Sequence, residues 1–383
     1  MKRRAFMITA AGTTAGMVLL PRMASAAPGV IDWYTASDTN ILDFWTNIVK
    51  PGFEAANPGI TLNLVDAGDN AGQLAIADRA LAAMQTNTDP QADYFETGDP
   101  RLPAGAIEAG LYVNIKEAGL SNYGKINPLA FDGDYSVPYR GSQVLLAYDT
   151  TKLDPANAPK TWDALVAWIK ANPGQFIYNR PDKGGSGGNF VRRAILAANG
   201  NDLGKFTVDN YTPESGDAAL NPAWAALADI APALFDGGAY TGGNTPSIQL
   251  LGQSAVTMIP AWSDQTIQAI NTGVLPETTG LVQLQDLALP GGFSRSIVLA
   301  NGVNKDAALK LADFILTEEV QSAVLSELGG FPGVSWDYVS QELRQKYADV
   351  IPTTIPSFPG GDWEKAINDG WYRNVAPNVD RNS

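Results

Sequence analysis

Short apolar strands alternate with amphipathic helical patterns along the chain, and this alternation restricts the possible folds more than any other feature. Residues 30–35 (VIDWYT) are typical of a buried strand, and apolar side chains then recur at helical spacing from Ile41 to Val49. Two further strands are predicted at 60–65 and 92–95, with a helix between them. Strands that alternate with helices form parallel sheets with crossover helices. The sequence therefore predicts an α/β fold.

The same alternation continues through most of the chain. Its 383 residues, at about 100–200 residues per domain, indicate two lobes that each have a core. Trp33 and Trp45 are expected in the core, and Pro51 is expected to kink or interrupt the first helix. Further strands are predicted at 142–148, 175–178, 255–260 and 296–301, and further helices after Pro159, from about Asn189 and over 305–325.

The first residues are typical of an export signal. Lys2, Arg3 and Arg4 precede the apolar run 5–20, and Ala24-Ser25-Ala26 is a small-residue cleavage pattern. The apolar run is shorter than the ~20 residues needed to cross a bilayer. We therefore expect a signal peptide over 1–26, cleaved after Ala26, and a periplasmic product. The paired arginines also fit the twin-arginine route.

Composition excludes several classes of function. The chain contains no Cys and no His, which excludes disulfides, zinc–thiolate sites and every Ser-His or Cys-His catalytic arrangement. Its net charge of −14 becomes more negative once the basic leader is removed, so nucleic-acid binding is not expected. We predict no cofactor, no metal site and no enzymatic activity.

Several phrases together resemble a known family. They are WYTASDTN, FWTNIVKPGFEAANPGITLNLV, APKTWDALVAWIKANPG, GQSAVTMIPAW and ANGVNKDAALKLADFILTEEVQSAVLSELGGFPGV, in that order over most of the chain. This order resembles the extracellular solute-binding proteins of bacterial ABC importers, family 1 type. The resemblance implies a type II periplasmic-binding-protein fold, in which each lobe is a mostly parallel sheet flanked by helices and a hinge joins the lobes. Because the chain has no Cys, a lipid-anchored variant is excluded.

The resemblance also implies where the chain passes between the lobes. Lobe one is expected over 27–138, lobe two over 139–294 and a return to lobe one over 295–330. The C-terminal helices of 331–383 are expected to pack on lobe two. VPYRG, at 137–141, is the expected first hinge crossing, because Pro restricts the backbone on one side and Gly frees it on the other.

Candidate ligand-binding residues follow the predicted strands, because ligands of open α/β sheets bind beyond the carboxyl ends of strands. Several of the candidate residues have a simpler alternative role. Those after the first strand could cap a helix, those after the third could lie in a solvated loop, and those at the crossing could form an interlobe salt bridge. Trp262 could pack in the core, and Arg295 could lie on the surface. The candidates are Ser37, Asp38, Thr39, Glu96, Thr97, Tyr139, Arg140, Arg180, Ser186, Gly187, Gly188, Trp262, Ser263, Asp264 and Arg295.

The stretch NRPDKGGSGGNFVRRAIL, at 179–196, could form an anion-binding site or a tight turn. Four glycines flank Ser186 before a predicted helix, and Arg180 and Lys183 precede them. Glycine-rich turns at helix N-termini can bind anions through backbone N–H groups. The alternative is a tight turn with ordinary capping. No Gly-Lys-Ser/Thr sequence closes the stretch, so it is not a P-loop.

The predicted function is capture of a small polar solute in the interlobe cleft, with hinge closure and delivery to a membrane permease of an ABC importer. The protein is expected to be a monomer. The basic residues and the glycine loop favour an organic anion, such as a phosphorylated, phosphonate or carboxylated compound. The acidic and aromatic residues would suit a sugar, polyol or polyamine. Two alternatives remain: a receptor's sensing partner, and a secreted glycoside-active enzyme that uses Asp38 and Glu96 as its acid and base.

Overall fold

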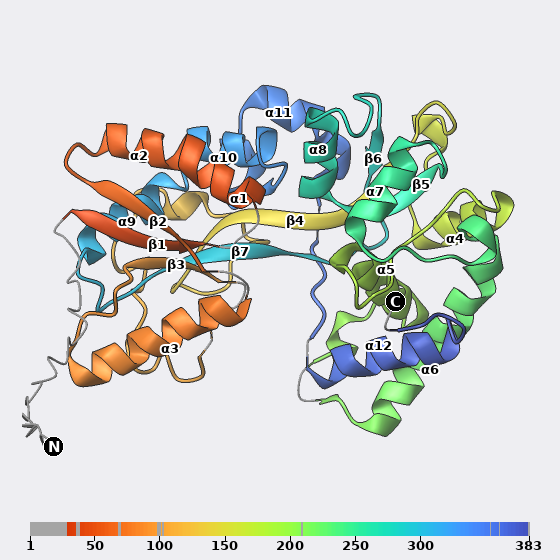
Figure 1. The fold of residues 1–383 in the computed structure, drawn as a ribbon, viewed down its shortest axis with the longest axis horizontal. Coiled ribbons are helices and arrows are strands. Elements are labelled where there is room, and N and C mark those ends of the chain that lie inside the picture. Colours follow the sequence, from red (N-terminus) through yellow and green to blue (C-terminus); the bar gives the residue numbers. More distant parts are fainter. Residues whose placement is uncertain are drawn as a thin grey trace, which may run out of the picture.

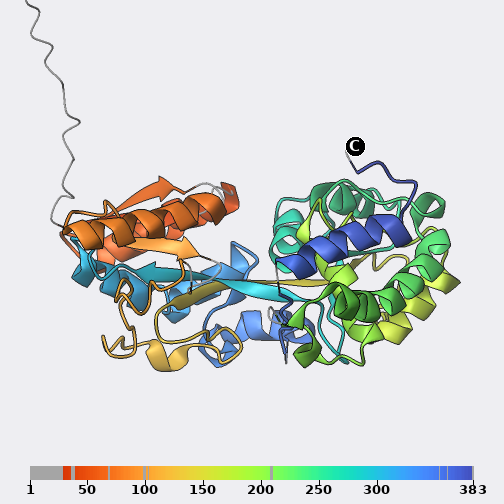
Figure 2. The same cartoon turned by 90° about the horizontal axis from the view of Figure 1, so that it is seen from below.

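The computed structural model describes residues 29–35, 39–67, 70–97, 101, 103–207, 210–352, 354–359 and 361–381. These residues form two lobes joined by a narrow waist (Figures 1 and 2). The expected signal peptide at 1–26 lies outside the described residues. Among those that are described, no helix has both the length and the apolar character that a membrane span requires.

One curved sheet runs through both lobes. Its strand order is β2-β1-β3-β7-β4-β5, and β6 and β8 also pair with β4. Pairing is parallel for β1 with β2 and for β1 with β3, and antiparallel for the pairs that β4 and β7 make. The strands are β1 (Val30–Thr35), β2 (Thr61–Asp66), β3 (Tyr94–Thr97), β4 (Val137–Tyr148), β5 (Met258–Trp262), β6 (Gly280–Val282), β7 (Gly291–Val298) and β8 (Phe331–Pro332).

Two long strands form the waist. β4 pairs with β7 and β8 through its first half and with β5 and β6 through its second half, so a single strand belongs to both lobes (Figure 1). The expected crossing at 137–141 is therefore part of β4 rather than a separate bend, with a register shift between Pro138 and Arg140. The strand predicted at 175–178 is wrong, because Phe176 makes only an isolated bridge to Met258.

Helices cover both faces of the sheet in lobe one. They are α1 (Thr39–Phe44), a π-helical turn (Trp45–Val49), α2 (Lys50–Ala56), α3 (Asn70–Thr86), α9 (Lys305–Phe314) and α10 (Glu318–Ser326). Pro51 does not end the helix, because Val49 and Lys50 keep helical backbone angles, but the π-helical turn Trp45–Val49 lies directly before it. The single helix predicted over 305–325 is wrong. Glu318 and Glu319 begin a second helix, because acidic side chains stabilise the first turn of a helix.

Lobe two is mainly helical around β5 and β6. Its helices are α4 (Trp162–Ala171), α5 (Gly185–Ala198), α6 (Pro213–Ile230), α7 (Asn244–Gly252), α8 (Ser263–Asn271) and α12 (Asp362–Asn374), and α11 (Gln341–Lys346) lies near the waist. Short 3₁₀ turns occupy Tyr123–Lys125, Pro155–Asn157, Leu203–Lys205, Ala231–Ala233, Phe235–Gly237, Trp336–Tyr338 and Ala348–Val350. Trp363 and Trp371 of α12 pack in the core of lobe two, whereas Val339 and Val350 belong to a cluster that extends from lobe one to α7 and α8 of lobe two. The segment after residue 330 therefore contributes to both lobes.

Stacked aromatic rings fill the core of lobe one beside the waist. The Trp33 ring centroid lies 4.3 Å from that of Trp45 and 4.5 Å from that of Tyr94. Trp45 in turn lies 5.5 Å from Tyr139 of β4, centroid to centroid. All four side chains are fully buried, which confirms the core prediction for Trp33 and Trp45. This stack anchors the first half of β4 against lobe one.

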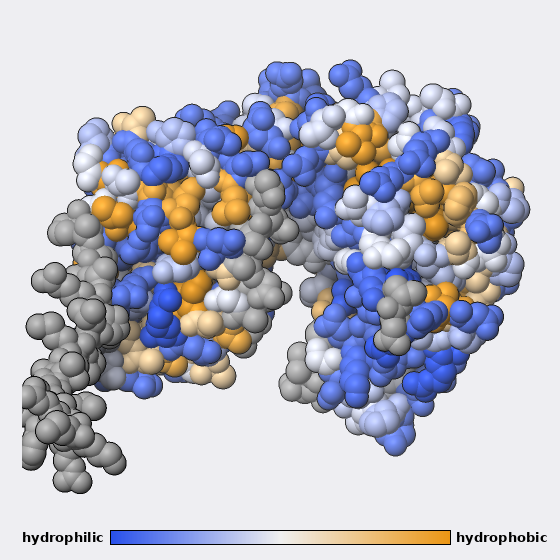
Figure 3. Space-filling model, viewed as in Figure 1, coloured by the Kyte–Doolittle hydropathy of each residue, from blue (hydrophilic) through white to orange (hydrophobic). Residues whose placement is uncertain are grey.

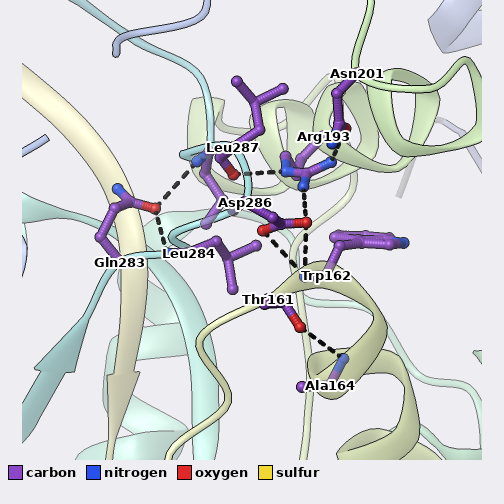
Figure 4. Close-up of polar contacts among 10 residues, drawn as sticks. Thr161, Trp162, Ala164, Arg193, Asn201, Gln283, Leu284, Asp286 and Leu287 are labelled. Atoms are coloured by element: carbon purple, nitrogen blue, oxygen red, sulfur yellow. Dashed lines mark hydrogen bonds and ion pairs between the residues drawn. The ribbon is translucent and has the colours of Figure 1, made fainter. Parts of the chain in front are cut away.

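A buried arginine organises lobe two (Figure 4). Arg193 of α5 is fully buried, and its guanidinium donates to the Leu287 carbonyl at 2.8 Å and to the Asp286 carboxylate at 2.8 Å. Asp286 also accepts from the backbone N–H of Trp162, the first residue of α4. The Arg193 Cζ atom lies 5.4 Å from the Trp162 ring centroid. One side chain thus ties α5, α4 and the segment before β7 together.

Candidate functional site

A deep hollow separates the two lobes on one side of the waist (Figure 3). The carboxyl end of β3, the middle of β4 and the first turn of α5 lie around it (Figure 1). Ser37 and Asp38 lie outside the described residues, as does the side chain of Thr39. Their predicted role after the first strand therefore stays a prediction.

An ion pair joins lobe one to the crossing strand. Arg140 Nη2 lies 2.7 Å from Glu96 Oε1, and the Glu96 side chain is only 2% exposed. Thr35 Oγ1 donates to Glu96 Oε2 at 2.7 Å, and Arg140 Nε donates to the Tyr139 hydroxyl at 2.8 Å. Glu96 and Thr97 lie within β3 rather than after it. The salt-bridge alternative at the crossing thus describes Arg140 correctly, while Tyr139 is buried in the core.

Arg295 is held by groups of lobe one. It lies within β7, opposite Thr97 of β3. Its guanidinium donates to the backbone carbonyls of Phe293 at 2.8 Å and Ala130 at 3.2 Å, and its Nε lies 3.8 Å from Asp132 Oδ2. These contacts fix the sheet edge beside the waist, so a ligand anion would compete with existing acceptors for Arg295.

The glycine-rich stretch is the first turn of a helix, not a loop before one. α5 begins at Gly185, so the start predicted near Asn189 is wrong. The Gly187 N–H donates to Asn179 Oδ1 at 2.8 Å, and the Ser186 N–H donates to Asn244 Oδ1 at 3.2 Å. The Ser186 hydroxyl lies 2.7 Å and 2.8 Å from the same two oxygens. Two donors that an anion would use are therefore already satisfied, as in ordinary capping.

Close packing explains the glycines themselves. A Cβ atom at Gly187 would lie 1.8 Å from the Asn179 carbonyl oxygen. A Cβ atom at Gly185 would lie 2.7 Å from the indole of Trp262. Gly187 and Gly188 are buried, and a Cβ at Gly188 would lie 3.0 Å from the Pro181 carbonyl oxygen. The run of glycines therefore lets the asparagine caps and the Trp262 ring approach the start of α5.

The capping asparagines were not among the sequence candidates. Asn179 opens the glycine-rich stretch, and asparagine is a strong capping residue, so a local signal existed for it. Asn244 starts α7, and no local pattern connects it to α5. Arg180 is buried beneath the C-terminal segment, where its Nη1 donates to the Asp380 carbonyl at 2.9 Å. This contact holds Arg180 against the tail of lobe two.

The residues at the end of β5 reach the waist. Trp262 is half-buried, and Ser263 is fully buried with its hydroxyl accepting from the Gln143 N–H at 3.3 Å. Asp264 is half-buried and accepts from the Ser142 hydroxyl at 2.6 Å. Ser142 of β4 was missed because it lies inside a predicted strand. Arg140, Ser142 and Asp264 therefore form a polar group at the point where the lobes meet.

A model of the bacterial extracellular solute-binding protein family matches residues 50–349. The chain belongs to this family. A search of curated protein sequences gave no match. Family membership makes the chain an exported solute-binding protein of an ABC importer, with a small-molecule ligand and a permease as its partners.

Solved structures show the same fold. A putative extracellular solute-binding protein from Bordetella parapertussis has a TM-score of 0.64 and 17% identity, over 91% of this chain and 99% of that one. A structure from work on xylan utilisation by Caldanaerobius polysaccharolyticus has a TM-score of 0.67 and 16% identity, over 91% and 96%. A spermidine/putrescine ABC transporter substrate-binding protein from Streptococcus pneumoniae has a TM-score of 0.64 and 15% identity, over 90% and 98%. The two-lobed type II periplasmic-binding-protein fold is confirmed.

This solute-binding protein has a second crevice away from the hollow. Its volume is about 820 Å³, and residues of α8, α10 and the segment before Ile351 line it, among them Asn271, Glu327 and Lys346. It contains none of the predicted site residues, and Glu327 and Lys346 are exposed. The polar group at the waist is therefore the better candidate for solute binding. Within the described ranges, no set of three or more acidic side chains could hold a metal ion.

The carboxyl group of Asp264 predicts a pH-dependent stability. Burial raises its pKa above the ordinary value of 3.8, and the Ser142 hydrogen bond and Arg140 offset this only in part. An acid with a raised pKa stabilises the fold below its unfolded pKa, and this stabilisation is lost as pH rises through the folded pKa. Without ligand, the free energy of unfolding of the natural solute-binding protein should therefore fall relative to Asp264→Asn as pH rises from about 4.

Asparagine can keep both hydrogen bonds that Asp264 Oδ1 accepts, from Ser142 and from the Gln265 N–H, so the substitution mainly removes the titration. Urea denaturation at a series of pH values measures the difference. Parallel pH profiles for the two proteins would show that Asp264 has an ordinary pKa.

Proposed function

We propose that the hollow between the lobes captures a small polar solute and that the lobes close over it by bending at β4 and β7. The observation that carries this proposal is the half-buried polar group of Arg140, Ser142 and Asp264, which lies where both lobes meet. In an open hollow such groups keep water as a partner, and a bound solute can replace that water. Closure is then favoured by contacts that the solute makes only in the closed form.

The remaining expectations fit this proposal. The protein acts as a monomer in the periplasm, is exported through its signal peptide, and presents the solute to the permease. The lobe boundaries at 138, 294 and 330 are part of the proposal, with β4 shared between the lobes. Binding without turnover is supported by Glu96, because its carboxylate is already paired with Arg140 and Thr35 and is thus poorly placed to act as an acid or base.

The groups that already bind the arginine side chains near the hollow bear on the charge of the solute. Arg140 is paired with Glu96, and Arg180 and Arg295 donate to backbone carbonyls. An organic anion, which the sequence favoured, would have to displace these acceptors and the asparagine caps of α5. A neutral solute rich in hydroxyl groups, or one that carries an amine, requires no such displacement. The fold itself accommodates varied ligands: one solved structure with this fold is an iron-bound protein from Pseudomonas aeruginosa, and another is a periplasmic thiamin binding protein.

A melting screen tests solute capture. Purified protein without its signal peptide is mixed with sugars, polyols, amines, amino acids and phosphate esters. A solute at 100 times its dissociation constant should raise the free energy of unfolding by ~2.7 kcal/mol, because it binds only the folded state. A screen without any shift in any class would argue against the proposed function.

A distance measurement tests closure. The chain has no Cys, so a pair of introduced cysteines carries labels without background. Ala75 of α3 and Lys365 of α12 are exposed, and these two helices belong to different lobes on opposite sides of the hollow (Figure 1). The label-to-label distance in Ala75→Cys/Lys365→Cys should shorten when the solute identified by melting is added. An unchanged distance with bound solute would exclude hinge closure.

A further inference from the structure

We propose that Asp264 and Trp262 recognise a positively charged nitrogen of the solute, such as a protonated amine or an aromatic ammonium group. This inference rests on the proposed function, because it places the recognition site at the waist of the same hollow. It adds the chemical class of the solute and the two side chains that select it.

Asp264 has a cation nearby, Arg140, but makes no close ion pair with it. Among the described residues it has no ion pair within 4 Å, although it is half-buried beside the waist. The hydrogen bonds that it accepts from Ser142 and from the Gln265 N–H both end on Oδ1. Neither of these two bonds uses Oδ2, so this atom can accept from a ligand donor. A charged donor suits it best, because a hydrogen bond between two ionised groups is stronger than one between neutral groups.

The neighbouring charges do not repel a cation. Arg140 contributes one positive charge near Asp264, but its guanidinium is 2.7 Å from the Glu96 carboxylate. The ion pair is neutral as a unit, so Asp264 leaves the polar group with one negative charge. The positive end of α5 is also capped, since the oxygens of Asn179 and Asn244 accept from its first N–H groups. The balance of charge at the waist therefore favours a cation.

Trp262 lies on the same side of β4 as Asp264. Trp262 pairs with Val144 in the β4–β5 register, and Asp264 accepts from Ser142, two residues earlier along β4. Side chains two residues apart in a strand point to one face and lie about 7 Å apart. Gly185 lies close against the indole and fixes its position. An indole ring and a carboxylate on this one face of β4 can bind one cationic nitrogen between them, by cation–π attraction and a charged hydrogen bond.

Calorimetric titration of the purified protein with matched solutes tests this inference. The probes are diaminobutane, butanediol and butanedioate as one set, and glucosamine with glucose as another, together with benzylamine. At least one amine should bind about 10-fold or more tightly than its hydroxyl counterpart, since a hydrogen bond to a charged group contributes 1.5–3 kcal/mol. Equal or tighter binding of a neutral or anionic counterpart would overturn the inference while leaving solute capture intact.

Substitutions separate recognition from folding. Asp264→Asn should weaken amine binding about 10- to 100-fold, and Trp262→Leu about 3- to 30-fold, while the melting temperature of ligand-free Asp264→Asn stays at or above that of the natural protein. Asp337→Asn is the matched control, because the Asp337 side chain is 86% exposed and pairs with Arg344 rather than with the polar group at the waist. If Asp264→Asn binds amines as tightly as the control does, Asp264 is not the recognition group.

Discussion

Replacing Arg193 by methionine should lower the free energy of unfolding by about 3 kcal/mol. Methionine keeps much of the apolar length of the side chain but removes every donor of the guanidinium. The Asp286 carboxylate, the Leu287 carbonyl and the Asn201 side-chain oxygen then lose a partner at 2.8–3.0 Å. Removing one partner of a buried ion pair costs 3–5 kcal/mol, and the partial exposure of Asp286 places this case at the lower end.

Urea denaturation measures the loss, and Arg344→Met is the matched control. Arg344 also pairs with an aspartate, but its side chain is 35% exposed and that of Asp337 is 86% exposed, so its loss should be within about 0.5 kcal/mol. Equal losses in the two variants would show that the buried network in Figure 4 does not stabilise lobe two.

Replacing Arg140 by methionine should lower the free energy of unfolding by about 3 kcal/mol. It should also weaken solute binding, because Arg140 belongs to the polar group at the waist. The Glu96 side chain is 2% exposed, and without Arg140 its charge has no cation at 2.7 Å. The Tyr139 hydroxyl loses its donor in the same step. Both effects act on the strand that joins the lobes, so stability and binding should fall together.

A second substitution distinguishes the cause of this loss. In Glu96→Gln/Arg140→Met the buried charge is gone, and glutamine can still accept from the Thr35 hydroxyl. The double variant should therefore recover more than half of the lost stability, while binding stays weaker than in the natural protein. Denaturation and calorimetry on both variants provide the two readouts. A double variant as unstable as Arg140→Met would mean that packing of the Arg140 stem, not charge, is decisive.

Local patterns predicted much of the fold. The first strand at 30–35 matches β1, and the helix predicted after Pro159 matches α4. Trp33 and Trp45 lie in the core because strand and helix periodicity both point them inward. These features depend on residues close together in the sequence, which is why one sequence is sufficient for them.

Features that depend on distant partners were not predictable in the same way. α5 starts four residues early because Asn179 and Asn244 cap it, and Asn244 is 58 positions from Ser186. β4 extends back to Val137 because β7, more than a hundred residues later, supplies hydrogen bonds for its first half. The sequence of 137–141 shows only the local bend tendency of Pro and Gly.

The candidate site likewise has features that the local sequence predicts and features that depend on distant residues. Trp262 and Asp264 lie at the end of β5 as the sequence predicted, whereas Glu96 lies within β3 and Arg140 within β4. The sequence could not show that Arg140 and Glu96, 44 positions apart, neutralise each other. That pairing makes an anionic solute less favoured, because the Arg140 guanidinium is already neutralised by Glu96.

The shared strand β4 has a consequence for how the molecule can be divided. A fragment that ends after residue 138 keeps β3 without β7, and one that begins there keeps β7 without β3, so each fragment has a bare strand edge. Such edges pair with other chains and aggregate. Neither half can therefore be produced as an autonomous module, and swaps of halves between relatives must exchange both β4 and β7 or neither.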